Sequence, residues 1–228
     1  MNGNSIEDYD AVFATIRPKN AVFGRVLLEM TEEKGVNTNI SSTCFFTLSK
    51  KNYLYYVLKK RDIKSPNTVV VPSEKAARNV HNQVEPPLVG RKIENLEETE
   101  IRKLETVEDI QSFAEGTEYE TDVLLFQNYD KGEKYRCLVV GDEIISLKDD
   151  SDSWKFKDEN PKYSNISDSK EQKIRECMNS LGTSVAEVKL RGEQIFDINP
   201  NPDLQLFSDA SGKNVYETVA DLLKEDEK

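Results

Sequence analysis

Two runs of alternating residues towards the C-terminus, "AEVKL" and "QIFDIN", constrain the fold most, because they predict a β-hairpin with two chemically different faces. A three-residue turn is expected at residues 191–193. One face is then apolar and carries Ala186, Val188, Leu190, Phe196 and Ile198. The other face carries Glu187, Lys189, Ile195, Asp197 and Asn199. Pro200 and Pro202 follow directly and end the ladder, which indicates a strand end.

Asp197 and Asn199 are the best candidates for a metal site in this hairpin. They are two residues apart on one strand, so both side chains project to the same face. Carboxylate and amide oxygens are hard ligands of the kind that Mg²⁺ prefers. Acidic and amide side chains at strand ends also serve turns, so the pattern leaves both interpretations open.

The remaining sequence predicts an α+β fold. Residues 10–16, 21–35 and 36–41 are predicted as strand, helix and strand, which is one βαβ unit, and a second helix is predicted over residues 49–62. Pro66 favours a domain boundary near residue 66. Beyond it the pattern predicts strands and helices in mixed order, with a hairpin turn at Gly141 and Asp142 and a long polar loop over residues 149–169.

Several strand ends carry polar residues that could bind a ligand. Arg136 begins a predicted strand, and its planar guanidinium matches the paired oxygens of a phosphate or carboxylate, although a surface arginine is an equally good interpretation. Arg91 and Lys92 close another strand, and alternation turns one of them inward. The strand before Arg136 ends at Gln127, Asn128 and Tyr129.

Composition excludes several classes of function. A chain of 228 residues with 37% hydrophobic and 32% charged residues is typical of a globular protein. The net charge of −11 predicts no nucleic-acid partner, and the absence of a long apolar run predicts no membrane span and a cytoplasmic location. Three widely spaced cysteines predict neither disulfides nor a metal site of the CxxC type. His81 is the only histidine, which argues against histidine-based catalysis.

The stretch "YDKGEKYRCLVVGDEIISL" resembles the middle of the ATP-grasp ligases, in particular the ribosomal-protein glutamate ligase and glutathione-synthetase-like branch. The order of further stretches extends the resemblance from about residue 10 to residue 223: "IKSPNT" is similar to the family's interdomain junction, "PLVGRK" to its phosphate-binding strand and "FDINPNPDL" to its metal-binding strand. The resemblance implies an ATP-grasp fold, in which two α+β subdomains enclose a nucleotide cleft, preceded by a short N-terminal α/β remnant. The implied domains are residues 1–66 and 67–228, the latter divided into a small lid-like subdomain (67–126) and a C-terminal subdomain (127–228).

The resemblance also implies residue roles. Lys51 would contact the nucleotide, Arg91 or Lys92 would lie over its phosphates, and Gln127, Asn128 and Tyr129 would hold adenine. Arg136 would face the acyl phosphate as the catalytic arginine, and Asp197 and Asn199 would bind Mg²⁺. The implied activity is that of an ATP-dependent carboxylate–amine ligase, with ATP, Mg²⁺, a carboxylate and an amine as its partners and with homo-oligomer formation possible.

Three departures from the family pattern favour an alternative function. Lys189 stands where the family has a second metal-binding acid, although Glu187, expected directly across from Asp197, could replace that acid. The lid segment, residues 92–105, has no glycine and five glutamates. The N-terminal domain is cut to one βαβ unit. A degenerate ATP-grasp module that binds nucleotide weakly, or serves as an interaction protein, is therefore the alternative, and a generic acidic α+β protein is a third.

Overall fold

The computed structural model describes residues 5–94, 97–117, 122–157 and 161–225. The chain forms two compact units, each described by itself below. The first unit comprises Met1–Ser49 and Gly132–Lys228, and the second is the continuous segment Lys50–Lys131. Part of the predicted lid (95–96) and part of the predicted polar loop (158–160) lie outside the described residues.

A five-stranded antiparallel sheet is the centre of the first unit. Its strand order is β11-β10-β7-β8-β9. The strands are β7 (Lys134–Val140), β8 (Glu143–Asp149), β9 (Lys162–Tyr163), β10 (Val185–Arg191) and β11 (Gln194–Asn199). The predicted turn at Gly141 and Asp142 is present, and Gly141 has the positive φ of 56° that such a turn requires.

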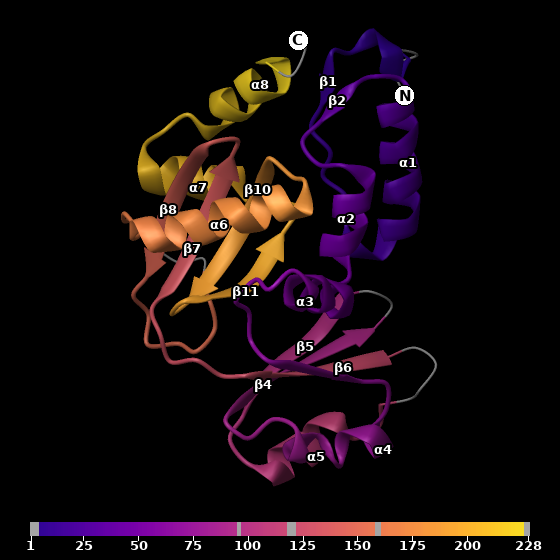
Figure 1. Ribbon diagram of the computed structural model, residues 1–228, viewed down its shortest axis with the longest axis vertical. Coiled ribbons are helices and arrows are strands. Elements are labelled where there is room, and N and C mark those ends of the chain that lie inside the picture. The colour runs from indigo at the N-terminus through magenta and orange to yellow at the C-terminus, as the bar shows by residue number, and fades with distance from the viewer. Residues whose placement is uncertain (1–4, 95–96, 118–121, 158–160, 226–228) are drawn as a thin grey trace. The chain divides into compact units, whose positions relative to one another are not determined.

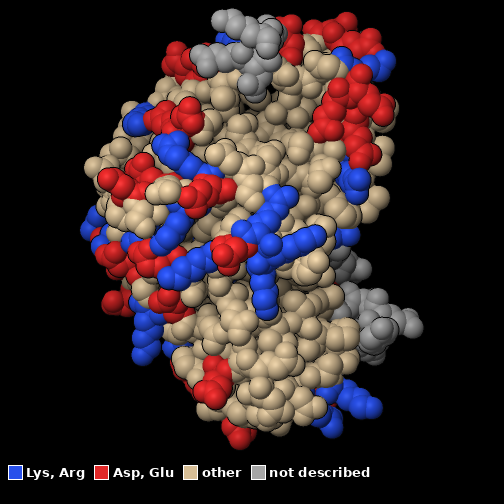
Figure 2. All heavy atoms as spheres, viewed as in Figure 1, with Lys and Arg blue, Asp and Glu red and all other residues tan. Residues whose placement is uncertain are grey.

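Three helices cover the two faces of this sheet: α6 (Asp168–Leu181), α7 (Leu204–Ser211) and α8 (Val215–Glu225). Figure 1 shows α6 crossing in front of the sheet while α7 lies behind it. The core on the α7 and α8 side is formed by apolar side chains from both layers, Leu138, Ile145, Leu147, Val185, Leu204, Phe207, Val215 and Val219 among them. Figure 2 shows acidic and basic side chains alternating where α6 lies, which identifies the outer face of that helix as the solvated one.

The N-terminal part of the first unit is the predicted βαβ unit. A 3₁₀ turn, Ile6–Asp8, precedes β1 (Ala11–Val12). Strands β1 and β2 (Asn37–Thr38) are parallel, and a second 3₁₀ turn, Pro18–Asn20, and α1 (Ala21–Glu33) connect them. Ala21, Gly24, Leu28 and Thr31 repeat at helical spacing and form the buried face of α1. Helix α2 (Ser42–Ser49) follows and packs against α1.

The second unit contains a four-stranded antiparallel sheet of order β3-β6-β4-β5, with α4 and α5 on one face. Its elements are α3 (Lys51–Lys60), β3 (Thr68–Val71), α4 (Glu74–Ala77), a 3₁₀ turn (Val80–Asn82), β4 (Leu88–Glu94), β5 (Glu97–Leu104), α5 (Val107–Ala114) and β6 (Asp122–Asn128). The core contains Leu88, Leu104, Leu124 and Phe126 from the strands, with Ile110 and Phe113 from α5. Figure 1 shows α4 and α5 on the same side of these strands.

The lengths of the helices can be compared with the prediction that the chain has no membrane span. Within the described ranges, no helix combines the length and the apolar character that a membrane span would need.

Candidate functional site

The β10–β11 hairpin differs from the predicted register. The connecting turn has two residues, Gly192 and Glu193, and a β-bulge interrupts the pairing after Lys189. As a result Glu187 pairs with Asn199 and Lys189 pairs with Asp197, so the expectation that Glu187 lies directly across from Asp197 is wrong.

The bulge also changes which side chains share a face. Ile195 pairs with Leu190 on the apolar face, whereas the ring of Phe196 contacts Arg191. The prediction placed Phe196 on the apolar face and Ile195 on the polar face, so both placements are opposite to the prediction. Glu187, Lys189, Asp197 and Asn199 do lie on one face of the hairpin, as the alternation indicates.

Arg136 lies on that same face, because it pairs with Lys189 across the β7–β10 ladder. Its Nε donates to Glu187 Oε1 at 2.6 Å, and both side chains are almost fully buried. Lys189 Nζ lies 3.9 Å from the same carboxylate oxygen. Glu187 is therefore a buried anion that two cations neutralise, and its carboxylate fixes the orientation of the Arg136 guanidinium.

Hydrogen bonds of the Asn199 and Asn201 side chains fix the end of β11. Asn199 Oδ1 accepts from the backbone N–H of Asn201 at 3.0 Å, and Asn199 Nδ2 donates to the Asn201 carbonyl at 2.9 Å and to Glu187 at 3.5 Å. The Asn201 side chain forms two hydrogen bonds with the backbone of Ile16. Its Oδ1 accepts from the Ile16 N–H at 3.1 Å, and its Nδ2 donates to the Ile16 carbonyl at 2.8 Å. The strand end is thus held from both sides, and the position of the Asn199 amide oxygen is fixed.

The donor set on this face fits a hard cation. Asp197 is 9% exposed and its Oδ1 accepts from the backbone N–H of Ile198 at 2.9 Å. Asn199 Oδ1 accepts one hydrogen bond and an amide oxygen has two acceptor positions, while the Asp197 carboxylate is a hard oxygen ligand of the kind that Mg²⁺ prefers. The candidate ligands on this face are the carboxylates of Glu187 and Asp197 and the amide oxygen of Asn199. Over the described part of the chain, no group of three or more His, Cys, Asp or Glu side chains is placed to hold a metal ion.

The sequence analysis overlooked Lys134, a buried cation on the same face of the sheet. Its Nζ lies 2.9 Å from Asp149 and donates to the carbonyls of Ser151, Ser153 and Lys155 at 3.1, 2.7 and 3.2 Å. Burial opposes the charge of Asp149, but hydrogen bonds from Ser151, from the Lys157 backbone and from Lys134 outweigh it and hold the pKa of Asp149 below its ordinary value. Lys134 and Asp149 together therefore order residues 149–157.

Arg191 is the second overlooked cation, and it holds the same loop. Its guanidinium lies over the rings of Phe156 and Phe196, 5.4 and 4.8 Å from their centroids, and donates to the carbonyl of Trp154. Lys134, Arg136, Lys189 and Arg191 occupy facing positions on β7 and β10. Alternation through "KYR" and "KLR" could have identified all four, had the charged residues two positions from Arg136 and Lys189 been considered.

In the second unit, Arg91 and Gln127 form the centre of a buried polar chain. Arg91 Nε donates to Gln127 Oε1 at 2.8 Å, and Gln127 Nε2 donates to the Thr68 hydroxyl at 3.1 Å. Arg91 also forms an ion pair with Glu98 at 2.5 Å. Glu98 belongs to the glutamate-rich lid segment, so one of its acids holds a predicted phosphate-binding cation in this structure.

The other predicted nucleotide-binding residues lie on several elements of the second unit. Lys92 pairs with Leu124, on the face that packs against α4 and α5, and contacts Glu94 at 3.7 Å. Tyr129 follows β6, and Lys103 Nζ lies 4.5 Å from its ring centroid. Asn128 ends β6, and Lys51 is the first residue of α3. The structure brings Arg91 and Gln127 together and does not bring Lys92 to them.

Comparisons with known proteins identify the family and the fold. Residues 49–223 match the RimK-like ATP-grasp domain family. A probable alpha-L-glutamate ligase of Cellvibrio japonicus (strain Ueda107) is 24% identical over 240 residues, covering 99% of this chain and 80% of that protein. D-alanine–D-alanine ligase from Bacillus anthracis has a TM-score of 0.70 at 16% identity, covering 97% of this chain and 83% of that one. The ATP-grasp ligase PsnB, in complex with a phosphomimetic variant of its minimal precursor, Mg and ADP, has a TM-score of 0.69 at 16% identity, covering 92% and 69%.

The solved structures confirm the predicted α+β, ATP-grasp fold. The family match covers 175 of the 228 residues, well over half of the chain. The chain therefore belongs to the RimK-like ATP-grasp domain family.

Proposed function

We propose that the protein is an ATP-dependent carboxylate–amine ligase that works through an acyl-phosphate intermediate. Membership of an ATP-grasp ligase family supports ATP-dependent ligation in general. The observation that carries the finer proposal is the polar face of the first unit's sheet, where Arg136, Glu187, Asp197 and Asn199 project together in a buried setting. The proposed domain division at residue 66 follows the family pattern and belongs to the same proposal.

Each residue of this face has a proposed role. Asp197 and Asn199 would hold Mg²⁺, with Glu187 as the third candidate ligand that shares its charge with Arg136. Bound magnesium would supply charge neutralisation for the phosphoryl oxygens. Arg136 would donate its remaining N–H groups to the acyl phosphate formed when a substrate carboxylate takes the γ-phosphoryl group of ATP. An amine then displaces phosphate, so no nucleophile from the protein is needed.

Roles in nucleotide binding are proposed for the second unit. Arg91, ordered by Gln127, would face phosphates, with Lys51 as a further cation. Gln127, Asn128 and Tyr129 would hold adenine. The curated relative is a probable alpha-L-glutamate ligase and PsnB acts on a peptide precursor, so we propose an amino acid or a peptide as the amine or carboxylate substrate.

Hydroxylamine trapping tests the proposal directly. A set of amino acids and acidic peptides is incubated with the protein, Mg-ATP and hydroxylamine, and both ADP and acyl hydroxamate are measured. We expect ADP and hydroxamate in equal amounts with the correct carboxylate. Asp197→Asn should reduce both by about 10²-fold or more, because a metal ligand and a fixed charge are removed. Asp142→Asn, the same change at an exposed turn, is the matched control.

The second candidate function is a degenerate ATP-grasp module without ligase activity. Lys189 favours it, since this cation pairs with Asp197 in the ladder and lies 3.9 Å from Glu187. Titration calorimetry with Mg-ATP separates the two candidates. The ligase requires measurable binding by the natural chain. The degenerate module predicts no heat at millimolar nucleotide, and a gain of Mg²⁺ binding in Lys189→Asp.

A further inference from the structure

Helix α1 has a second apolar face in addition to the one that it buries. Ala21, Gly24, Leu28 and Thr31 face the interior of the first unit. Five further apolar side chains project outward and are 40–69% exposed: Val22, Phe23, Val26, Leu27 and Met30. At about 100° per residue, these five positions cover a continuous stripe of about 140° opposite the buried face. We call these five residues the outer stripe.

Such a stripe is unusual for a surface helix. A helix that packs on one side normally carries charged residues on the opposite side. In α1 the charged residues Arg25, Glu29 and Glu32 lie along one flank, where Arg25 pairs with Glu29 at 2.8 Å and Glu32 accepts from the N–H of Ser42 at 2.6 Å. A contiguous exposed apolar patch on the order of a few hundred Å² marks an interaction surface.

No described element of the first unit covers the outer stripe. Figure 1 shows α1 at the margin of that unit, with α2 on its inner side. The high exposure of Phe23 (69%) and Val22 (63%) agrees with this position. The exposed tyrosines Tyr163 and Tyr216 lie on different elements, β9 and α8, and do not continue the stripe.

We propose that the outer stripe is a homodimer interface, in which α1 packs against α1 of a second copy in an antiparallel, two-fold arrangement. The stripe is centred on Val26, so an antiparallel pair places Val26 on the axis and Val22 opposite Met30 of the partner. Val22, Val26 and Met30 then each meet an apolar side chain of the second copy, while Phe23 and Leu27 lie at the levels of its Glu29 and Arg25, so the centre of this two-fold interface is self-complementary.

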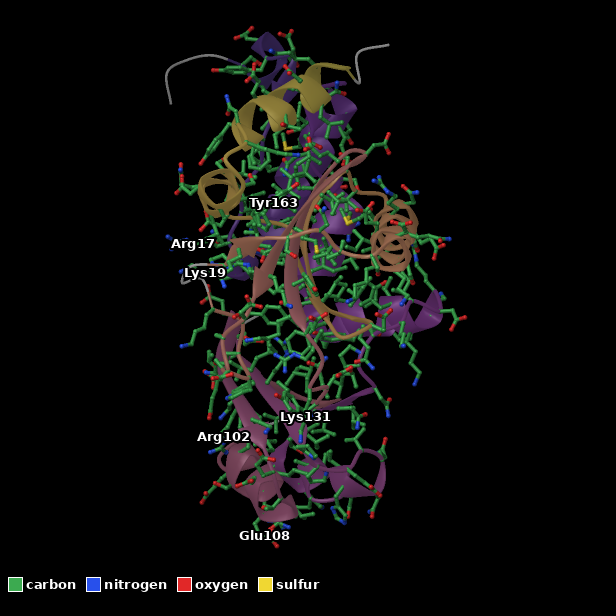
Figure 3. All side chains as sticks on the ribbon, turned by 90° about the vertical axis from the view of Figure 1, so that its left-hand side faces the viewer. Arg17, Lys19, Arg102, Glu108, Lys131 and Tyr163 are labelled. Atoms are coloured by element: carbon green, nitrogen blue, oxygen red, sulfur yellow. The ribbon has the colours of Figure 1, made fainter. Side chains whose placement is uncertain are left out.

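The charges at the ends of α1 select the antiparallel orientation. Arg17 and Lys19 precede the helix and are exposed, and Figure 3 shows both pointing away from the protein. Glu29 and Glu33 lie in the last turns. An antiparallel pair brings the basic end of each helix to the acidic end of the other, with Lys19 opposite Glu33, and it also opposes the two helix dipoles. A parallel pair would place like charges together.

The size of the stripe sets the expected strength. One helix of 13 residues is about 20 Å long and offers less area than the roughly 800 Å² per partner of a standard interface. The dimer is therefore weak, with a dissociation constant in the micromolar range. The surface buried in the dimer comes from the outer stripe and from the charged residues at the two ends of α1.

Sedimentation velocity over a concentration series from micromolar to millimolar tests the interface. The natural chain should change from monomer to dimer, and Phe23→Glu with Met30→Glu should remain monomeric. Tyr163→Glu, a matched charge at an exposed apolar residue on β9, should dimerise like the natural chain. Circular dichroism confirms that each variant is folded. A natural chain that stays monomeric throughout, or a double variant that still dimerises, would overturn the proposal.

Cysteine crosslinking tests the orientation. The three native cysteines are buried, so introduced surface thiols can be oxidised selectively. Val26→Cys should crosslink to itself, and an equimolar mixture of Val22→Cys and Met30→Cys should give mainly the mixed dimer. Crosslinking of Val22→Cys with itself in preference to the mixed pair would indicate a parallel arrangement and contradict the proposal.

Charge reversal provides an independent test of the same pairing. Lys19→Glu or Glu33→Lys alone should weaken dimerisation severalfold, because each places like charges together at both ends of the interface. The double variant should recover the natural dissociation constant. Additive weakening in the double variant would show that Lys19 and Glu33 do not meet across the interface.

Discussion

The buried pair of Arg136 and Glu187 serves both the fold and the proposed chemistry of the candidate site. Glu187 is fully buried and lies 2.6 Å from the Arg136 guanidinium. Removing one partner leaves an uncompensated buried charge, whereas replacing both with apolar side chains of similar volume costs little stability. The two contributions can therefore be separated by mutation.

Urea unfolding makes this separation measurable. We expect Arg136→Met to lower the free energy of unfolding by about 3–5 kcal/mol and the double variant Arg136→Met with Glu187→Met to recover most of that loss. Hydroxamate formation should be abolished in both variants, since the proposed anion-binding guanidinium is missing. A double variant as unstable as the single one would contradict the pairing, and retained activity in the stable double variant would contradict the role of Arg136.

Asp149 gives a pH dependence of known sign. Hydrogen bonds from Ser151, Lys157 and Lys134 outweigh burial and lower the pKa of this carboxyl in the folded chain below 3.8. A depressed folded pKa contributes stability above the unfolded pKa, and that contribution is lost as pH falls through the folded pKa.

Asp149→Asn should therefore unfold more easily than the natural chain at pH 7, and the difference should shrink below about pH 4. Chemical unfolding at pH 7, 5, 4 and 3 measures it. Asp142→Asn, the same change at an exposed turn, is the matched control. A constant difference down to pH 3 would show that folding does not lower the pKa of Asp149.

At the scale of elements, the absence of a side chain at Gly24 allows α1 and α2 to pack closely. A Cβ atom at this position would lie 2.7 Å from the Phe45 ring and 2.8 Å from Ile16 Cγ2. A glycine-to-alanine change inside a helix normally stabilises by about 1 kcal/mol. Here the cost of the clash exceeds this gain in helix propensity, because overpacking a filled interface costs about 1–3 kcal/mol.

We expect Gly24→Ala to lower the melting temperature, which differential scanning calorimetry measures. Val22→Ala, on the exposed side of the same helix, is the matched control and should leave the melting temperature nearly unchanged in dilute protein. A stabilised Gly24→Ala variant would mean that α2 moves easily away from α1.

Elements with a clear period could be predicted from the sequence, and those without one could not. The strands β4 to β8 and the helices α5, α6 and α8 follow from alternation, helical spacing and glycine turns. Helix α2 was missed because six of its eight residues are buried, so "STCFFTLS" has no polar face to mark a period. Helix α7 is short, and its start depends on Asp203 accepting from the N–H of Leu206, a cap that lies directly after Pro202.

The candidate site was predictable in its residues but not in its contacts. Alternation placed Glu187, Asp197 and Asn199 on one face, and the resemblance to ATP-grasp ligases identified Arg136. The bulge after Lys189 shifts the pairing by one residue, and no residue type in "KLRGEQIF" specifies where a bulge falls. The partnerships of Arg136 with Glu187 and of Arg91 with Gln127 depend on strand order, because their members lie 51 and 36 residues apart.

At the scale of the whole molecule, the chain leaves the first unit after Ser49 and returns to it at Gly132. The second unit is thus one continuous segment with its own core, in which Leu88, Leu124 and Phe126 of the sheet pack against Ile110 and Phe113 of α5. Its four strands pair only with one another within the described residues. A continuous segment with a closed core and complete strand pairing is expected to fold independently.

A fragment of residues 50–131 should therefore unfold cooperatively with heat and with urea, as followed by circular dichroism. Its stability should be modest, since a domain of about 80 residues rarely gains more than about 3–5 kcal/mol from one core. Phe126→Ala in the fragment should remove about 3–5 kcal/mol and abolish the transition. Lys75→Ala, an exposed change on α4, leaves this core intact and should preserve the transition. A gradual, non-cooperative loss of signal in the unmodified fragment would show that this core needs the rest of the chain.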